Sequence, residues 1–326
     1  MRISEIFDKV KGKKVIIAGD SMIDSYTFGR IDRDSPEAPV PVVKIEKEKL
    51  KLGGAANVAL NIKSLGLEPI LCTVIGDDSD GQDFVRLCRE SNIDTDGIIV
   101  DNSRKTTNKN RVIVSDKHII RIDNESTKNI SEKLRDFFVE TVNKLSTKSE
   151  IIIFQDYDKG TLDKSSISKI IKQNKKSFIS VDPKKRNFFN YENVDLFKPN
   201  LNEILNAYAS NDSSEKNLKK ISKELSIKNK IENLMITLSE RGLMIHNNQG
   251  NFKYKIKRKK IIDVSGAGDT VISLATLLFY LKLPEKFIGE MCNLAGGITC
   301  MKSGVNAIDL KELIKNAEIN NLDIYI

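Results

Sequence analysis

The stretch Asp263–Thr270, with the sequence DVSGAGDT, has the residue types that an anion-binding catalytic turn needs. The small residues Gly266–Gly268 let backbone N–H groups approach an anion, and the apolar helix predicted over Thr270–Leu281 adds the positive end of its dipole. Asp269 stands where this helix begins, and a carboxylate there can accept a proton from a hydroxyl nucleophile. The same residues also fit a tight turn with a capping aspartate, which is the alternative interpretation. The stretch is neither a P-loop nor a G-x-G-x-x-G fingerprint. The natural alternative to those two motifs is a transfer reaction that uses oriented N–H groups and a carboxylate base.

A second glycine pattern, Gly53-Gly54-Ala55-Ala56-Asn57, opens a helix that we expect to continue to Leu65. Two glycines permit the backbone to approach a ligand closely. The carboxamide of Asn57 offers both a donor and an acceptor. An ordinary helix start is the alternative interpretation.

Two carboxylates follow the first predicted strand, Val15–Ala18. Asp20 and Asp24 lie where an α/β sheet presents its ligand-binding groups. Carboxylates accept hydrogen bonds from sugar hydroxyls and also bind metal ions, and the residues alone do not separate these two roles.

A fourth pattern, Asn200-Leu201-Asn202-Glu203, places an amide and a carboxylate three residues apart on one helix face. Such a pair can hold magnesium-bound water near phosphates. The same spacing is typical of a capping box, which is the alternative.

These patterns sit within an alternation of strands and helices that indicates a mostly parallel sheet covered on both faces. Ligands of such sheets bind beyond the carboxyl ends of the strands. We expect strands at 15–18, 69–75, 98–100, 151–154, 178–181 and 234–237, and helices at 55–65, 81–91, 132–145, 165–173 and 270–281.

Two segments, 24–52 and 106–122, interrupt this alternation with proline-rich or alternating strand patterns. We expect them to form antiparallel strands that pair into a small lid. The polar segment 206–229 predicts a surface helix with loops. The basic run Lys253–Lys260 predicts a strand with one solvated face.

Composition excludes several classes of protein. The chain has 326 residues, 40% of them hydrophobic and 30% charged, and no apolar run approaches the length of a membrane span. Four dispersed cysteines and two histidines argue against a zinc site. The net charge of +8 suits either nucleic acid or anionic small substrates, but few aromatic residues argue against stacked single strands. The start lacks the apolar core of a signal peptide, so we expect a cytoplasmic protein without nucleic-acid or membrane partners.

Taken together and in this order, the motifs resemble the ribokinase-like, or PfkB, sugar kinase family. The glycine pattern at 53–57 is similar to the first family signature and Asp263–Thr270 to the second. Leu274 departs from the pattern, where a small residue is commoner, and this concerns helix packing. The resemblance implies one ribokinase-like domain over 1–326. It implies an α/β three-layer sandwich with a mostly parallel central sheet and a small antiparallel β lid, inserted at about 25–52 and 101–123.

Longer stretches resemble the D-glycero-β-D-manno-heptose-7-phosphate kinases. These stretches are 19–45, 111–123, 156–162, 181–191, 198–203 and 237–245. The resemblance implies ATP-dependent phosphorylation of the anomeric hydroxyl to the 1,7-bisphosphate, on the route to ADP-heptose for lipopolysaccharide or related glycans. Another sugar or sugar phosphate is the alternative substrate. Adenylyl transfer is expected from a separate protein.

The same resemblance implies residue roles. Asp269 is the expected base, and the anion hole is expected from the backbone of Gly266, Ala267 and Gly268. ATP with Mg²⁺ is expected to bind Asn200, Leu201, Asn202, Glu203, Ser239 and Gly242, with Glu203 reaching the metal through water. The sugar is expected to contact Asp20, Asp24, Gly53, Gly54 and Asn57. Candidates for the second phosphate, which needs cations, are Lys109, Arg111, Arg121, Lys159 and Lys185. Exposed edges of the lid predict a homodimer.

Overall fold

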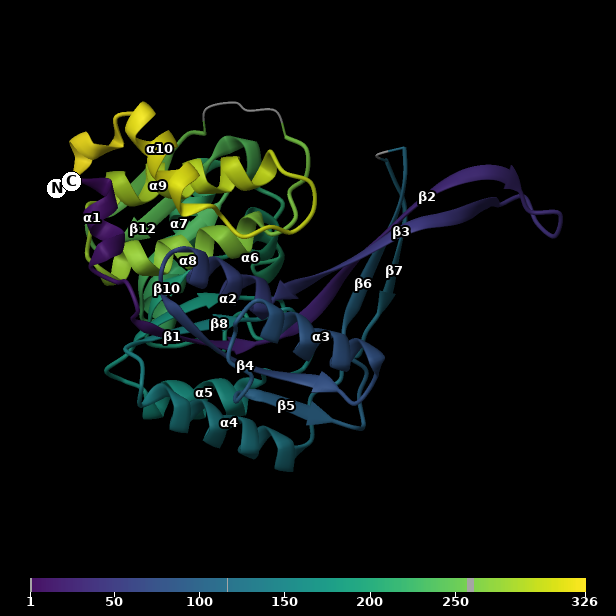
Figure 1. Cartoon of the computed structure of the whole chain (residues 1–326). Coiled ribbons are helices and arrows are strands. Elements are labelled where there is room, and N and C mark those ends of the chain that lie inside the picture. The colour runs from purple at the N-terminus through teal and green to yellow at the C-terminus, as the bar shows by residue number, and fades with distance from the viewer. Residues whose placement is uncertain (1, 116, 257–260) are drawn as a thin grey trace.

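A central nine-stranded sheet organises the chain in the computed structural model, which describes residues 2–115, 117–256 and 261–326 (Figure 1). All neighbouring strands are parallel except β12, which is antiparallel to both β11 and β13. The predicted mostly parallel sheet is therefore confirmed. From one edge to the other, the strands are β13 (Gly250–Tyr254), β12 (Leu243–Asn247), β11 (Ile231–Thr237), β10 (Val194–Phe197), β9 (Phe178–Asp182), β8 (Ile151–Gln155), β1 (Lys14–Gly19), β4 (Glu68–Gly76) and β5 (Ile98–Asp101).

Helices cover both faces of this sheet because successive strand residues point to opposite sides. In β1, Val15 and Ile17 belong to one buried cluster, whereas Ile16 and Ala18 belong to the other. The first cluster packs beneath α1 (Ile3–Asp8), α2 (Ala55–Ser64), α3 (Ser79–Glu90), α8 (Ala267–Tyr280), α9 (Glu285–Cys300) and α10 (Leu310–Ile319). The second packs against α4 (Glu132–Ser146), α5 (Lys164–Gln173), α6 (Leu201–Ala207) and α7 (Glu215–Asn229). The three-layer arrangement is as predicted.

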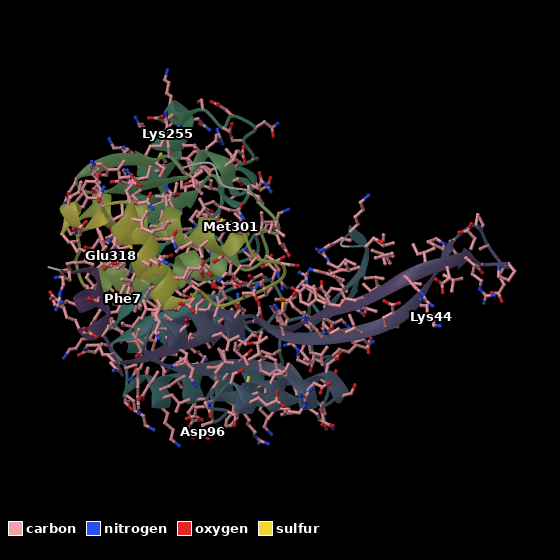
Figure 2. The ribbon with its side chains drawn as sticks, turned by 45° about the horizontal axis from the view of Figure 1, so that its top comes forward. Phe7, Lys44, Asp96, Lys255, Met301 and Glu318 are labelled. Atoms are coloured by element: carbon pink, nitrogen blue, oxygen red, sulfur yellow. The ribbon has the colours of Figure 1, made fainter. Side chains whose placement is uncertain are left out.

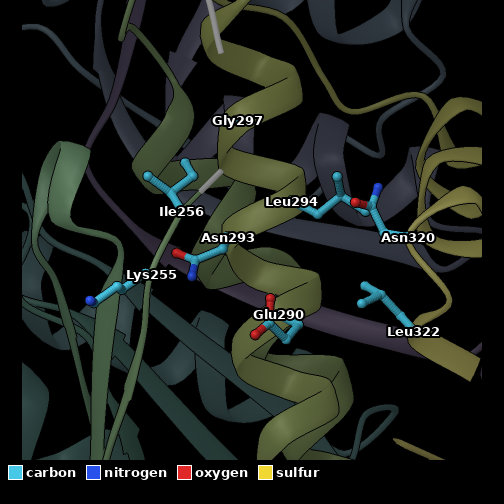
Figure 3. A pocket seen from close by; sticks show the side chains of 8 residues that line it. All are labelled: Lys255, Ile256, Glu290, Asn293, Leu294, Gly297, Asn320 and Leu322. Atoms are coloured by element: carbon cyan, nitrogen blue, oxygen red, sulfur yellow. The ribbon is translucent and has the colours of Figure 1, made fainter. Parts of the chain in front are cut away.

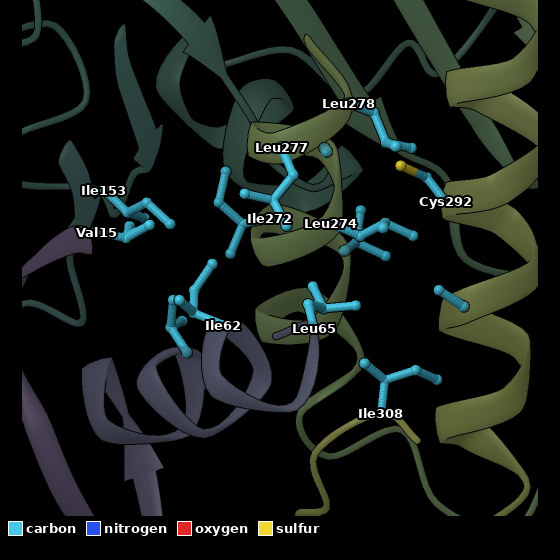
Figure 4. Close-up of a cluster of buried hydrophobic side chains, with 14 of the residues drawn as sticks. Val15, Ile62, Leu65, Ile153, Ile272, Leu274, Leu277, Leu278, Cys292 and Ile308 are labelled. Carbon is cyan, nitrogen blue, oxygen red and sulfur yellow. The ribbon is translucent and has the colours of Figure 1, made fainter. Parts of the chain in front are cut away.

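Helix α8 is buried along almost its whole length, which fixes the position of its first turn. Figure 4 shows Ile272, Leu274 and Leu277 of α8 between α2 and α9. Leu274, where the family pattern favours a small residue, is fully buried. Because interiors pack as densely as crystals, such a helix cannot shift without opening cavities.

A second sheet of four strands projects from the body (Figures 1 and 2). Its order is β3 (Pro41–Gly54), β2 (Ser21–Asp34), β6 (Asn108–Val114) and β7 (Lys117–Asn124). Each hairpin is antiparallel as predicted, but β2 and β6 join the two hairpins in parallel. The exposed Lys44 marks the outer part of the β2–β3 hairpin in Figure 2.

The basic run Lys253–Lys260 differs from its prediction. Its first two residues end β13, where Tyr254 pairs with Leu243, the first residue of β12. Residues 255 and 256 have no strand partner in β12 because that strand begins at Leu243, so the predicted strand stops there. Residues 257–260 lie outside the described residues.

The polar segment 206–229 contains the end of α6 and all of α7, as a helix with a loop. The sequence patterns did not identify β10, β12, α9 or α10, which complete the sheet and one helical layer. Among the helices that the structure describes, none has the length and apolarity of a bilayer span.

Candidate active site

A glycine immediately before α8 shapes the start of this helix. Gly266 precedes the helix with a φ of +79°, a conformation that side chains with a Cβ rarely adopt. A Cβ there would lie 3.0 Å from Nδ2 of Asn57. The N–H groups of a first helical turn have no carbonyl partner within the helix, so this turn can receive an anion.

Asp269 lies in that turn and is 3% exposed. Its carboxylate accepts hydrogen bonds from three side chains, one on α2, one at the end of β8 and one in the loop after β8. Asn57 Nδ2 of α2 donates to Oδ2 at 2.7 Å, whereas Gln155 Nε2 at 3.1 Å and Tyr157 Oη at 2.8 Å donate to Oδ1. Asn57, which was predicted to contact the sugar, thus donates to the predicted base Asp269 and joins the two glycine-containing motifs. The carboxamide of Asn57 is fully buried and directed at this carboxylate.

Burial raises the pKa of Asp269 to about 6 because water no longer solvates its charge. The hydrogen bond from Asn57 opposes this effect, the negative charge of Asp182 adds to it, and Tyr157 and Lys198 oppose it. Such a carboxylate is ionised at neutral pH and remains basic enough to take a proton.

Two lysines lie beside the start of α8, the buried Lys198 and the partly exposed Lys184. Lys198 Nζ is 3.0 Å from Asp182 Oδ2, and both side chains are almost fully buried. Gly268 faces this pair, since a Cβ there would lie 3.8 Å from Lys198 Nζ. Lys184 forms an ion pair with Glu203 and lies 3.9 Å from Asp182 Oδ1. Two lysine ammonium groups and their carboxylate partners therefore lie together beside the start of α8.

The NLNE pattern forms the capping box that its spacing allows. Asn200 Oδ1 accepts from the Glu203 amide at 2.9 Å, and Glu203 Oε2 accepts from the Asn200 amide at 2.7 Å. Leu201 packs against the core and Asn202 is exposed. The carboxylate of Glu203 still reaches Lys184, so capping and a place in the site coexist.

The oxygen donors present fit a magnesium ion that is held by few protein ligands. Mg²⁺ prefers oxygen and usually keeps several waters, with one or two carboxylates and substrate phosphates. Asp182 and Glu203, both bound to Lys184, are two carboxylates near the α8 start in addition to Asp269. No group of three metal-ligating side chains occurs among the described residues.

Asp20 accepts three backbone N–H groups from one loop. Oδ2 accepts from Tyr157 at 2.9 Å and Lys159 at 3.0 Å, and Oδ1 accepts from Thr161 at 3.0 Å. The side chain is 1% exposed. These contacts order the segment 157–161, which carries Tyr157 to Asp269.

Asp24 lies at the base of the lid and forms a short ion pair with Arg111 of β6. The guanidinium of Arg111 also lies 5.4 Å from the ring centre of Tyr26. Gly53 makes room for the carboxylate, because a Cβ there would lie 2.2 Å from Asp24 Oδ2. Gly54 has a φ of +59° and backs onto the carbonyl of Asp20.

The remaining predicted cations lie in two places. Some lie near Asp24 at the base of the four-stranded sheet, which is the lid, and this region is called the lid floor; the others lie on the surface. Lys109 and Lys159 share Glu125, at 3.4 and 2.7 Å, and Lys109 also lies 3.3 Å from Asp123. Lys109 is the register partner of Asp24, so this group adjoins the Asp24 site. Arg121 pairs with Asp123 but its side chain is 57% exposed. Lys185 is exposed, and its neighbour Lys184 faces the site instead.

A cavity of about 430 Å³ opens beside the start of α8. Ser239 and Gly242, both predicted nucleotide contacts, line it together with Ala267 and Gly268. The rest of its lining is mostly apolar or small, and half of it comes from α8 and α9: Thr237, Glu240, Leu243, Ile256, Ile261, Val264, Val271, Cys292, Asn293, Gly296, Gly297 and Cys300.

A smaller hollow of about 50 Å³ adjoins this cavity, and Figure 3 shows it between α9 and the segment after β13. Ile256, Asn293 and Gly297 line both spaces. An apolar cavity that ends at a helix N-terminus suits a ligand with a flat apolar part and a phosphate tail.

Sequence reasoning missed several polar side chains of this site. Gln155 and Asp182 are the last residues of β8 and β9, Tyr157 follows Gln155 by two residues, and Lys198 directly follows β10. Their position at the carboxyl ends of strands was the available signal. Lys198 was not identified by this signal because no strand was predicted at 194–197. Lys184 was not identified because it follows its strand by two residues.

Comparisons with known proteins fit this geometry. The family model described as "pfkB family carbohydrate kinase" matches residues 13–312. The chain belongs to the pfkB family of carbohydrate kinases. This pfkB-family chain is therefore a phosphotransferase, and sugar kinases of the family use ATP.

Several relatives carry the name bifunctional protein HldE. The one from Helicobacter pylori (strain HPAG1) is 36% identical over 308 residues, which cover 92% of this chain and 65% of the relative. The one from Sulfurimonas denitrificans is 32% identical and covers 92% of this chain and 63% of the relative. The pfkB-family chain thus spans slightly less than two thirds of the length of these relatives.

Solved structures share the fold. Phosphofructokinase-2 from Escherichia coli in complex with potassium superposes with a TM-score of 0.77 at 16% identity, covering 94% of this chain and 99% of that chain. Ribokinase from Thermotoga maritima superposes with a TM-score of 0.72 at 15% identity, covering 94% and 99%. The predicted ribokinase-like fold with its additional small sheet is confirmed.

Proposed function

We propose that this pfkB-family kinase transfers the γ-phosphoryl group of ATP to the anomeric hydroxyl of D-glycero-β-D-manno-heptose 7-phosphate, giving the 1,7-bisphosphate. The observation that carries the proposal is the buried carboxylate of Asp269 at a helix start, between a largely apolar cavity and the charged floor of the lid. The sequence resemblance to the heptose-7-phosphate kinases supports this choice of sugar. A kinase for another sugar or sugar phosphate is the second candidate.

In this proposal Asp269 accepts the proton of the attacking hydroxyl. The N–H groups of Gly266, Ala267 and Gly268 and the buried Lys198 stabilise negative charge on the transferring group, as preorganised dipoles and cations do in a water-poor site. Glu203 and Asp182 would hold Mg²⁺, directly or through water, and the bound ion neutralises phosphate charge. Asn200 positions Glu203, and Ser239 and Gly242 contact the nucleotide.

The sugar half of the site lies under the lid. Asp24, held by Arg111, accepts hydrogen bonds from sugar hydroxyls. Gly53 and Gly54 allow the sugar to approach, whereas Asp20 and Asn57 act by holding the 157–161 loop and the base. Lys109 and Lys159 provide cations for the 7-phosphate, since Glu125 keeps them together at the lid floor. Arg121 stands further out, on an exposed strand.

We also infer that the chain is one kinase domain, with the lid inserted, and that it forms a homodimer through the lid. All eight residues of β7 are exposed, including Ile119, Ile120 and Ile122. An edge strand with exposed apolar side chains favours pairing with another copy. Light scattering should give twice the mass of the chain, and Ile122→Asp should reduce it to the monomer mass. A monomer mass for the unaltered protein contradicts the inference.

The reaction belongs to the cytoplasm, where ATP is supplied, and it precedes an adenylyl transfer that we assign to a separate catalytic unit.

The decisive experiment is ADP release from ATP·Mg²⁺ with a panel of acceptors: D-glycero-D-manno-heptose 7-phosphate, sedoheptulose 7-phosphate, fructose, fructose 6-phosphate and ribose. Turnover confined to the manno-heptose phosphate supports the proposal. Turnover on another acceptor only replaces the substrate and retains the Asp269 chemistry. No turnover on any acceptor contradicts both.

A further inference from the structure

The two oxygens of Asp269 are not equivalent. Oδ1 accepts from both Tyr157 Oη, at 2.8 Å, and Gln155 Nε2, at 3.1 Å, whereas among the residues that the structure describes Oδ2 accepts only from Asn57 Nδ2, at 2.7 Å. An ionised carboxylate has about four acceptor sites, two on each oxygen. Oδ1 is therefore saturated, and the open site is on Oδ2.

The orientation of the Gln155 carboxamide follows from its neighbours. Its Nε2 lies 3.1 Å from an oxygen of Asp269 and 3.4 Å from Asp182 Oδ2. A reversed carboxamide would direct its oxygen at two carboxylates, which repel it. Gln155 is fully buried, so it keeps this role as a donor.

Tyr157 is held equally firmly. Its amide is bound by Asp20, and its ring lies 5.1 Å from Lys184 Nζ. Arg104 adds a second contact to the loop by donating to the carbonyl of Lys159. Burial, followed by the negative charge of Asp269, raises the pKa of Tyr157 well above its usual value, so its hydroxyl remains a donor at every working pH.

We propose that Tyr157 and Gln155 are positioning residues that occupy Oδ1 of Asp269 and thereby make Oδ2 the atom that takes the proton. This inference rests on the proposed function. The acceptor hydroxyl gives its proton to Oδ2 as its oxygen forms a bond to the γ-phosphorus. The bond from that phosphorus to the bridging oxygen breaks, and its electron pair leaves with ADP. The proton stays on Oδ2 until the products depart and solvent removes it.

The loss of the Tyr157 hydroxyl has a predictable sign. That hydroxyl donates to the ionised form of Asp269, so its removal makes ionisation less favourable and raises the pKa of the base. The acidic limb of the pH–rate profile then moves to higher pH. The other charged groups that face Asp269 and Tyr157 are Asp182, Lys198, Lys184 and Asp24, and none of them changes in a Tyr157→Phe variant.

The chain offers a matched control. Tyr191 also donates its hydroxyl to a buried aspartate, Asp156 Oδ2, at 2.9 Å. Tyr157→Phe should move the acidic limb up by about half to one pH unit and lower the plateau kcat about three- to thirtyfold. It should leave the KM for ATP unchanged. Tyr191→Phe removes the same group without touching Asp269 and should leave the limb in place. Equal limbs in Tyr157→Phe and the unaltered protein overturn the proposal, as does an equal shift in Tyr191→Phe.

A second readout needs no substrate. In protein labelled with ¹³C at aspartate carboxyls, the Asp269 signal is the one that Asp269→Asn removes. Its titration midpoint should rise in Tyr157→Phe, and in Gln155→Met if the first variant does not fold. A raised midpoint with no turnover on any sugar rejects the proposed function and retains the positioning role. Coincident titration curves reject the positioning role whichever sugar is the substrate.

Discussion

The substitution Asp269→Asn tests the central assignment because it removes the base and preserves its shape. General bases contribute about 10²–10⁴ to turnover, so we expect kcat to fall by about that factor. The structure also predicts how activity depends on pH. With a pKa of about 6, roughly one tenth of the carboxylate is ionised at pH 5, whereas more than about nine tenths would be ionised at its ordinary pKa of 3.8.

The unaltered protein should therefore lose about tenfold in kcat/KM between its plateau and pH 5, measured by coupled ADP release. The residual activity of Asp269→Asn should not follow that limb. An acidic limb below about pH 4.5, or near-normal turnover in the variant, refutes the assignment of Asp269 as a buried base.

The same pKa has a consequence for stability. Because burial raises the pKa of Asp269 in the folded state, the folded state binds a proton more tightly than the unfolded state between pH 3.8 and about 6. Stability from this group therefore increases as the pH falls through that window. Relative to Asp269→Asn, the unaltered protein should gain about 1 kcal/mol of unfolding free energy from pH 7 to pH 5, measured in urea.

Asp195 provides the control for the loss of activity that is expected in Asp269→Asn. Burial raises its pKa as well, and its Oδ2 accepts from the Ile179 amide at 2.6 Å. It lies near the start of β10, whereas the site lies beyond the carboxyl ends of the strands. Asp195→Asn should leave kcat and its pH profile unchanged. A loss as large as that in Asp269→Asn would show that removing any buried carboxylate lowers activity.

Four further substitutions, the first with a matched control, test other parts of the site. Lys159→Met should raise the KM for the sugar phosphate about tenfold, in steady-state kinetics, whereas the exposed Lys185→Met should not change it. Lys198→Met should lower kcat by about 10–10³ and move the acidic limb to higher pH, because its charge lowers the pKa of the base. Gly54→Ala should cost about 1–3 kcal/mol in denaturant unfolding, since the residue has a φ of +59° and a Cβ would lie 2.4 Å from a backbone carbonyl. Cys300→Phe should fill part of the cavity beside α8 and raise the KM for ATP more than it lowers kcat.

The lid illustrates how far periodicity can predict a fold. Alternating residues identified both hairpins, because the two faces of a strand meet different surroundings and the pattern records this. The parallel pairing of β2 with β6 was not predictable, since local alternation carries no information about which strand lies alongside. The basic run after Phe252 shows the opposite case. Its strand pattern continues beyond the point where the neighbouring strand offers a partner, so the strand ends before the pattern does.

The sequence by itself determined the family, the α/β alternation and the glycine-rich turn that carries Asp269, because these depend on residue types at short spacing. Only the tertiary structure decided what surrounds that carboxylate. Asn57 comes from α2, Gln155 and Tyr157 from the end of β8 and the loop after it, and Asp182 from the end of β9. The strand residues meet because parallel strands end at one edge of a sheet. The pKa of the base depends on this burial and on these neighbours, so it is a property of the folded chain and not of the motif.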